Sequence, residues 1–251
     1  MKKLWKADTV SSLTKLSFLL CLILTVHLVG QASAETDADG LWAGEIELGG
    51  VATSGNTKTK NFNTRLMVSN KSPKWDHKAV FTGFYTDGGS DDDTRIFTAS
   101  VNSGYKLSKS SYLVAAFKYE NDRLTGYDYR FNESIGYGRK LIDGDRIKLK
   151  VEAGPGGRHS RLNNGDQIDE LILRAAFDLR WKISKTATLT ENFLTVSGDE
   201  GTVVESTTAL KSNIIGTLAM KFSFKVKWNS DPPNEVENTD TITSITLVYG
   251  F

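Results

Sequence analysis

Apolar and polar side chains alternate along most of this chain with a period of two residues, and this pattern constrains the fold more than any other feature. From 218 to 228 every even position is apolar, whereas Lys221, Lys225 and Lys227 occupy odd positions. Residues 171–181 repeat the pattern with apolar odd positions. Successive side chains of a β-strand point to opposite faces, so each segment predicts a strand with one apolar and one charged face.

Twelve segments of this kind follow one another, each bounded by turn residues. We predict strands at 41–53, 58–70, 75–86, 95–107, 111–121, 127–140, 146–157, 169–183, 187–197, 203–212, 217–229 and 240–251. An even number of strands, each with room for the roughly 9–11 residues that cross a bilayer, is typical of membrane barrels. The predicted fold is therefore all-β, an up-and-down antiparallel transmembrane β-barrel of about 12 strands formed by residues 35–251.

A soluble barrel or sandwich would give the same alternation, with the apolar face turned inward instead of toward lipid. The lengths of the connections favour the membrane form. Tight connections at 70–74, 108–110, 143–145, 184–186 and 213–216 alternate with longer ones at 86–94, 122–126, 158–168 and 230–240. Only the connections 54–57 and 198–202 are short where a longer one is expected. Outer-membrane barrels sort short periplasmic turns and longer external loops in this way.

Composition excludes two other classes. With 39% hydrophobic residues the chain cannot supply several helical membrane spans, each of which needs about 20 mostly apolar residues. A formal net charge of +1 argues against a nucleic-acid-binding protein, which normally carries a basic excess.

Aromatic residues support the membrane barrel. Trp42, Trp75 and Trp181 lie near strand ends on the apolar face, as the aromatic girdles of membrane barrels do. The chain ends with Tyr249 and Phe251, both on the apolar face of the last strand. We interpret these two residues as an assembly signal, which makes the barrel-assembly machinery and periplasmic chaperones expected partners.

The N-terminus predicts export. Four lysines precede an apolar run from Leu16 to Val29, and Ala32-Ser33-Ala34 follows it, so residues 1–34 are predicted to be a cleaved signal peptide. The apolar run is shorter than a spanning helix requires. Cleavage would also remove Cys21, the only cysteine, leaving a mature chain without disulfides or thiol nucleophiles.

Several short motifs resemble the YdiY-like family, described as salt-induced outer membrane proteins of Gram-negative bacteria with a domain of unknown function. The motifs are Ser54-Gly55-Asn56-Thr57, Asp128-Tyr129-Arg130, the segment 136–143, Gly154-Pro155-Gly156, Asn229-Ser230-Asp231-Pro232-Pro233 and Thr239-Asp240-Thr241. The resemblance covers essentially the whole mature chain. It implies an outer-membrane barrel and an association with salt or osmotic stress, and it supplies no catalytic or binding residues.

Catalytic and metal chemistry have little support, and we predict neither enzymatic activity nor a cofactor. The mature chain would have two histidines, His77 near a strand end and His159 in the predicted loop 158–168. His159 is followed by Ser160, but no third group is placed to orient the pair. A barrel phospholipase is thus the least favoured function. The acidic loop 87–93 offers oxygen ligands without the spacing of a calcium loop, so cation binding there stays open.

The charged face of the strands is the candidate functional surface, because it would line the lumen of a membrane barrel. Its candidate lumen-lining residues are Arg65, Lys118, Glu120, Lys148, Lys150, Glu152, Arg174, Asp178, Arg180, Lys221, Lys225 and Lys227. Lysines outnumber the other charges on strands 146–157 and 217–229, which would favour anions in an open pore. The same charges could instead form ion pairs that close the barrel, and lumen width does not decide between these two readings.

We therefore expect a monomeric outer-membrane barrel of a Gram-negative bacterium, surrounded by lipid and lipopolysaccharide. Its function is either that of a narrow channel for small solutes or ions or that of a non-conducting structural protein of the envelope. Glu133 falls on the apolar face and Glu191 makes its strand ambiguous. We expect both to lie near a membrane interface or beside a β-bulge that resets the register.

Overall fold

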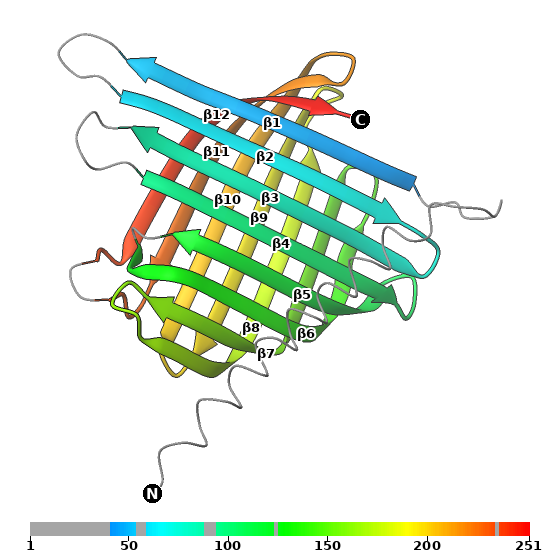
Figure 1. The fold of residues 1–251 in the computed structure, drawn as a ribbon. Coiled ribbons are helices and arrows are strands. Elements are labelled where there is room, and N and C mark those ends of the chain that lie inside the picture. Colours follow the sequence, from blue (N-terminus) through cyan, green and yellow to red (C-terminus); the bar gives the residue numbers. More distant parts are fainter. Residues whose placement is uncertain (1–40, 54–58, 88–93, 123–124, 234–235) are drawn as a thin grey trace, which may run out of the picture. The chain divides into compact units, whose positions relative to one another are not determined.

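The structure is a computed structural model, and it describes residues 41–53, 59–87, 94–122, 125–233 and 236–251. These residues form a closed antiparallel β-barrel of twelve strands (Figure 1). The predicted fold and strand number are confirmed. In the described part of the chain, no helix has the length and apolar character needed to span a membrane.

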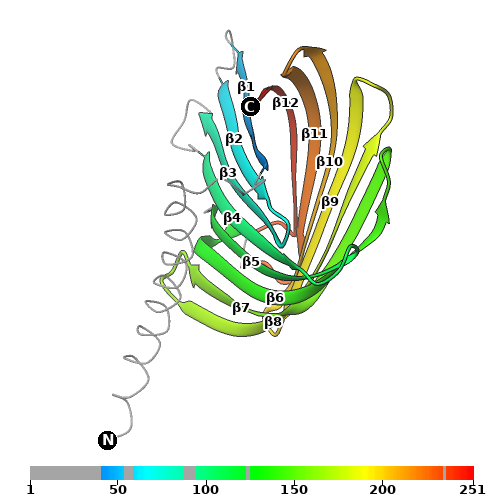
Figure 2. The same ribbon diagram turned by 90° about the vertical axis from the view of Figure 1, so that its right-hand side faces the viewer.

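The strands follow the chain order around the barrel. Their bounds are β1 Leu41–Thr53, β2 Thr59–Lys71, β3 Trp75–Asp87, β4 Thr94–Lys106, β5 Ser111–Asp122, β6 Tyr127–Asp143, β7 Ile147–Leu162, β8 Gln167–Lys182, β9 Ala187–Gly198, β10 Gly201–Ile215, β11 Leu218–Asn229 and β12 Thr239–Gly250. Each strand pairs with the next, and β1 pairs with β12 to close the sheet. Figure 2 shows the sheet curving round until the first and last strands meet.

The seam between β1 and β12 is shorter than the other pairings. Glu45 to Leu48 pair with Gly250 to Leu247, and Gly44 exchanges two backbone hydrogen bonds with Phe251. By contrast, β1 and β2 stay in register from Leu41–Lys71 to Thr53–Thr59. The closing seam therefore has the fewest ladder hydrogen bonds of the barrel.

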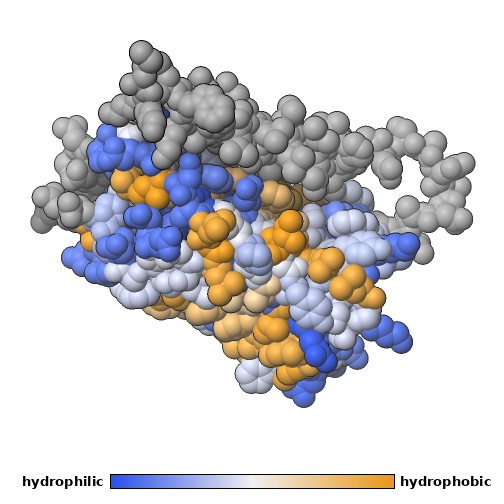
Figure 3. Space-filling model, turned by 90° about the horizontal axis from the view of Figure 1, so that it is seen from below, coloured by the Kyte–Doolittle hydropathy of each residue, from blue (hydrophilic) through white to orange (hydrophobic). Residues whose placement is uncertain are grey.

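The outer wall carries the apolar side chains, as the alternation predicts for a membrane barrel. Leu171, Leu173, Phe222, Phe224 and Ile245 are all exposed, although they are large and apolar. Figure 3 shows patches of hydrophobic side chains over one face of the wall, with hydrophilic side chains mainly toward its ends. In a closed barrel every strand has two neighbours, so backbone groups are paired even where no water is present.

Three strands are clearly longer than predicted. One is β10, which spans Gly201–Ile215 where 203–212 was expected, and the others are β6 and β7. β6 extends to Asp143 and β7 extends to Leu162, so the segment 158–168, predicted as a long loop, is mostly strand. His159 and Ser160 therefore lie on β7. The period of two was hidden at 158–162 because both faces carry polar residues there, and a register shift between Tyr127 and Tyr129 of β6 interrupts the pairing with the end of β7. A second register shift, between Lys140 and Ile142, precedes the extension of β6.

Two predictions lie outside the described residues. The predicted signal peptide, residues 1–34, is one of them, and residues 88–93 of the acidic loop are the other. Both stay predictions.

Candidate functional site

The interior of the barrel holds three groups of ion-paired side chains. The loop-side group consists of Lys118, Glu120 and Asp122 on β5, Glu205 on β10, and Lys225 and Lys227 on β11. The turn-side group consists of Glu45 and Glu47 on β1, Arg65 on β2, Lys211 on β10 and Lys221 on β11. The β7–β8 group consists of Lys150 and Glu152 on β7, Arg174 and Asp178 on β8, and Tyr112 on β5.

The loop-side group joins opposite walls of the barrel. Lys227 on β11 forms an ion pair with Glu120 on β5, and these strands are six positions apart in a ring of twelve. Lys118 on β5 likewise pairs with Glu205 on β10, five positions away. Lys118 also lies 3.3 Å from Glu120, and Lys227 lies 3.4 Å from Asp122. Such contacts require that these side chains cross the lumen, which they narrow.

The turn-side group holds together the two sides of the closing seam. The carboxylate of Glu47 on β1 accepts a hydrogen bond from Arg65 at 2.5 Å and a second one from Lys221 on β11. Glu47 is only 3% exposed, so its two cationic partners compensate a charge that is largely removed from water. Lys211 on β10 reaches Glu45 on β1 across β11 and β12.

The β7–β8 group is positioned by an aromatic ring and a glycine. Tyr112 on β5 donates its hydroxyl to Glu152 at 2.9 Å, and Arg174 donates to the same carboxylate at 3.0 Å. The ring of Tyr112 lies against Gly138 on β6, where an added Cβ would come within 2.3 Å of the ring. A side chain at position 138 would therefore push the tyrosine away from Glu152.

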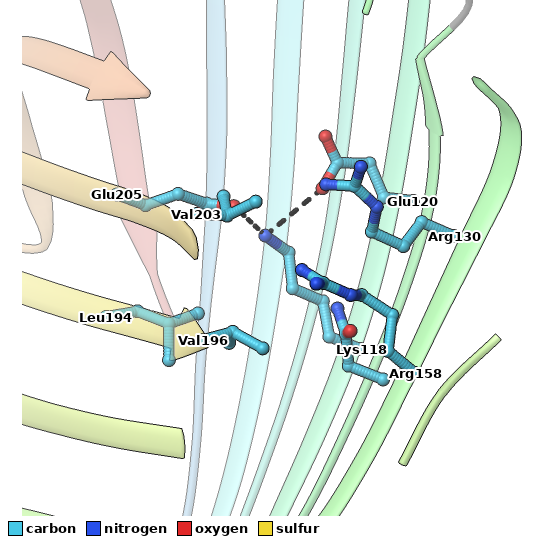
Figure 4. A pocket seen from close by; sticks show the side chains of 9 residues that line it. Lys118, Glu120, Arg130, Arg158, Leu194, Val196, Val203 and Glu205 are labelled. Atoms are coloured by element: carbon cyan, nitrogen blue, oxygen red, sulfur yellow. Dashed lines mark hydrogen bonds and ion pairs between the residues drawn. The ribbon is translucent and has the colours of Figure 1, made fainter. Parts of the chain in front are cut away.

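A small cavity lies beside the loop-side group. About 270 Å³ of space there is not filled by atoms, and part of that space is open to solvent. Its lining residues are Lys118, Glu120, Arg130, Asn132, Arg158, Leu194, Val196, Val203 and Glu205. In Figure 4 the charged ends of Lys118, Arg130 and Arg158 all point into the same space. This cavity is narrow.

The structure brings most of the predicted lumen residues together. Ten of the twelve belong to the three groups, namely Arg65, Lys118, Glu120, Lys150, Glu152, Arg174, Asp178, Lys221, Lys225 and Lys227. Lys148 lies at the turn end, where it is largely exposed and 3.6 Å from Asp143. Arg180 makes none of the ion pairs found among the described residues.

Sequence reasoning did not select several interior residues. Arg158 is 2% exposed and donates to Glu170 at 2.5 Å and to the backbone carbonyl of Gly201 at 2.9 Å. It was missed because residues 158–168 were predicted to be a loop. Arg130 shares the inward parity of its strand, and that parity was a usable signal.

One charged residue on the outer wall behaves differently from expectation. Glu191 lies in the middle of β9, where the pairings with β8 and β10 show no register shift. A β-bulge is therefore absent there. Instead, the carboxylate accepts hydrogen bonds from Ser206 at 2.6 Å and from Thr208 at 2.5 Å, both on β10. Two neighbouring hydroxyls thus satisfy a carboxylate that faces outward.

Glu133 belongs to a polar contact near the loop end of the wall. Its carboxylate lies 3.7 Å from His159, whose other ring nitrogen lies 2.7 Å from Asp169. Ser160, next along β7, is buried on the opposite face, so the histidine and the serine do not meet. Among the described residues, no group of His, Asp and Glu side chains is arranged to hold a metal ion.

The C-terminal aromatic residues lie on the outer wall at the turn end. Tyr249 and Phe251 are 55% and 61% exposed. Phe251 also pairs with Gly44 through its backbone, and its ring covers the space that a side chain at position 44 would fill.

These features define a class of protein. A closed, even-stranded antiparallel barrel with an apolar outer wall and a charged interior is the fold of outer-membrane β-barrels. The fold is similar to that of the NanC porin, at 11% identity over 82% of this chain and 97% of that chain with a TM-score of 0.50. It is also similar to an outer membrane channel from Pseudomonas putida F1, at 8% identity over 87% and 97% of the two chains with a TM-score of 0.51. At these identities the similarity shows the fold alone.

The family follows from the sequence. Residues 46–251 match the family described as "Protein of unknown function, DUF481", and the chain belongs to this family. It is 28% identical over 213 residues to the uncharacterized protein YdiY of Escherichia coli (strain K12), a match covering 83% of this chain and 82% of YdiY. The resemblance to the YdiY-like family is thus confirmed.

Proposed function

We propose that the protein resides in the outer membrane of a Gram-negative bacterium and acts as a narrow pathway for small ions, closed at rest by the loop-side group. One observation carries the proposal: Lys227 and Lys118 form ion pairs with carboxylates on the far wall. These contacts cross the polar lumen and obstruct it at the loop-side group. Since each of them depends on a flexible lysine side chain, the closure can open without unfolding the barrel.

The test is ion conductance through the purified barrel in planar lipid bilayers. Wild type is expected to give small or rare conductance steps. A variant with Lys118→Ala and Lys227→Ala removes both long side chains from the lumen and is expected to give larger and more frequent steps. Lys148→Ala removes a lysine at the exposed turn end and serves as the matched control, with steps like those of wild type. The absence of any step in both wild type and the double variant would exclude the channel.

The charge of the pathway provides a second measurement. Lys225 and Lys227 face the loop-side part of the lumen, so they favour anions if ions pass there. Changing Lys225 to Glu in the open double variant is expected to shift the reversal potential toward cation selectivity. An unchanged reversal potential would mean that ions do not pass this residue.

A non-conducting structural protein is the second candidate, and the three ion-paired groups favour it. Together they link β1, β2, β5, β7, β8, β10 and β11 through the interior, which makes the barrel stiff. For this function the double variant would remain electrically silent but lose stability. The same recordings therefore decide between the two candidates.

The link to salt or osmotic stress is part of this proposal. Salt shortens the screening length from about 10 Å at 0.1 M to about 3 Å at 1 M, which weakens the more exposed pairs of the loop-side group, such as Lys225–Glu205, whose lysine side chain is 31% exposed. If the closure loosens in this way, conductance will rise between 0.1 and 1 M KCl by more than the conductivity of the solution. A strictly proportional rise would remove the link.

We also propose partners for the protein, and we expect it to have no catalytic activity. Lipid and lipopolysaccharide surround the apolar wall, and the barrel works as a monomer. Tyr249 and Phe251 act as the signal for the barrel-assembly machinery, while periplasmic chaperones carry the unfolded chain. Deleting Phe251 is expected to lower the amount of heat-modifiable, folded barrel in outer-membrane fractions. Incubation with phospholipid is expected to release no fatty acid.

A further inference from the structure

The cavity beside the loop-side group contains a cation without a counter-ion. Arg130 on β6 is 6% exposed, and no carboxylate of the described residues forms an ion pair with it. Its Nε atom is buried and has no hydrogen-bond acceptor. A guanidinium stays protonated in proteins, so this charge cannot be removed by loss of a proton.

The carboxylates of the cavity are already occupied. Glu205 and Glu120 both bind Lys118, and Glu120 binds Lys227 as well. The other arginine, Arg158, is compensated by Glu170, which lies outside the cavity. Three cations and two carboxylates therefore line the space, and Arg130 is the cation that remains uncompensated.

An aromatic contact stabilises Arg130 but leaves its Nε–H group without an acceptor. Its guanidinium carbon lies 3.8 Å from the centre of the Tyr127 ring, a cation–π geometry that holds the group in place. A ring face provides no acceptor in line with the Nε–H bond. The buried amide oxygen of Asn132, also in the cavity lining, has no partner either. Turning this amide by 180° would point its NH₂ donors into the same space.

We propose that this cavity is a binding site for one small monovalent anion, a halide or an ion of similar size, held by Arg130. The lining residues explain why the ligand would be a small anion. Donors from Arg130 and Asn132 and the charges of Lys118 and Arg158 surround a narrow space, while Leu194 and Val196 line its other side (Figure 4). The space is too narrow for a sugar, and a cation would meet three positive groups. The anion site does not depend on the proposed ion pathway, because it requires only the folded barrel.

The test uses chloride as the probe and the full-length mature barrel in detergent. Exchange between free and bound chloride broadens the ³⁵Cl NMR line, and a real site gives excess broadening that saturates as chloride is added. For wild type we expect such saturation. Arg130→Gln removes the charge and the Nε donor, and it is expected to weaken chloride binding by about ten- to a hundredfold, as for loss of a hydrogen bond to a charged group.

A matched control lies on the same strand. Arg139 is exposed on the outer face of β6, so Arg139→Gln makes the same change of charge away from the cavity and is expected to leave binding unchanged. Broadening that never saturates in wild type, or equal broadening in wild type and Arg130→Gln, would overturn the site.

A crystallographic measurement covers the case in which Arg130→Gln does not fold. Wild-type crystals grown with bromide should show an anomalous peak within hydrogen-bond distance of Arg130 Nε, and a cavity without this peak would also overturn the proposal. Neither experiment depends on conductance, so failure of the anion site and failure of the proposed pathway are separate results.

Discussion

Changing Lys227 to methionine tests whether the interior of the barrel is closed. Lys227 and Glu120 each have side chains that are 7% exposed, and the Asp122 side chain is 8% exposed. Methionine keeps much of the side-chain volume but removes the charge. Glu120 then retains Lys118 at 3.3 Å, whereas Asp122 loses the one lysine with which it forms an ion pair among the described residues.

The expected size of the effect differs between a closed and an open lumen. Removing one partner of a buried ion pair costs about 3–5 kcal/mol, because the other charge remains without compensation. In a wide, water-filled lumen the same change would cost about 0–1 kcal/mol. We expect the larger value, which at a urea dependence of about 1–3 kcal/mol/M lowers the unfolding midpoint by about 1 M or more.

The assay is urea unfolding of the refolded barrel in detergent, followed by tryptophan fluorescence. Lys148→Met is the matched control, since Lys148 is 57% exposed at the turn end and should change the free energy of unfolding by less than about 1 kcal/mol. Adding Asp122→Asn to Lys227→Met removes the carboxylate left without its lysine and should restore part of the loss. A midpoint for Lys227→Met equal to that of Lys148→Met would refute the closed interior.

Three further outcomes follow from particular contacts. Ser206→Ala should lower the free energy of unfolding by about 1–3 kcal/mol, because the Glu191 carboxylate in the lipid-facing wall loses a hydrogen bond of 2.6 Å. The measurement is urea titration in lipid vesicles, and a change within its error would show that water reaches this carboxylate. Gly138→Ala should lower the free energy of unfolding by about 1–3 kcal/mol in the same titration, since its Cβ would lie 2.3 Å from the Tyr112 ring. Adding Tyr112→Leu to this variant should restore part of the lost stability, and no restoration would mean that the strain lies elsewhere. Amide hydrogen exchange should be faster along the β1–β12 seam than along β3–β4, because the seam has fewer ladder hydrogen bonds, and equal protection would contradict the short seam.

The alternation of side chains predicted most of the strands, and it failed where a second influence acted. The segment 217–229 was predicted almost to the residue, because its phenylalanines and lysines fall strictly on opposite faces. The extension of β7 to Leu162 was missed because, beyond the apolar belt, both faces carry polar residues such as Arg158 and His159. Periodicity reports only a difference between the two faces of a strand.

The candidate site could be predicted in part. Inward parity is enough to identify Lys118, Glu120 and Lys227 as lumen residues. Parity along a strand says nothing about which strand stands opposite, so the sequence did not indicate that Lys227 meets Glu120. It likewise did not single out Arg130 as a cation of the cavity with which no described carboxylate forms an ion pair, because that property depends on every other charge in the cavity.

The sequence by itself determined that this chain forms a sheet with one apolar and one charged surface, because every second side chain contributes to the alternation. The lengths of the connections and the aromatic residues near strand ends then favoured the arrangement in which the apolar surface faces lipid. Whether the lumen is open or bridged was decided by the tertiary structure alone. Bridging depends on how closely walls from distant parts of the chain approach one another, and that separation is a property of the closed barrel that no single strand encodes.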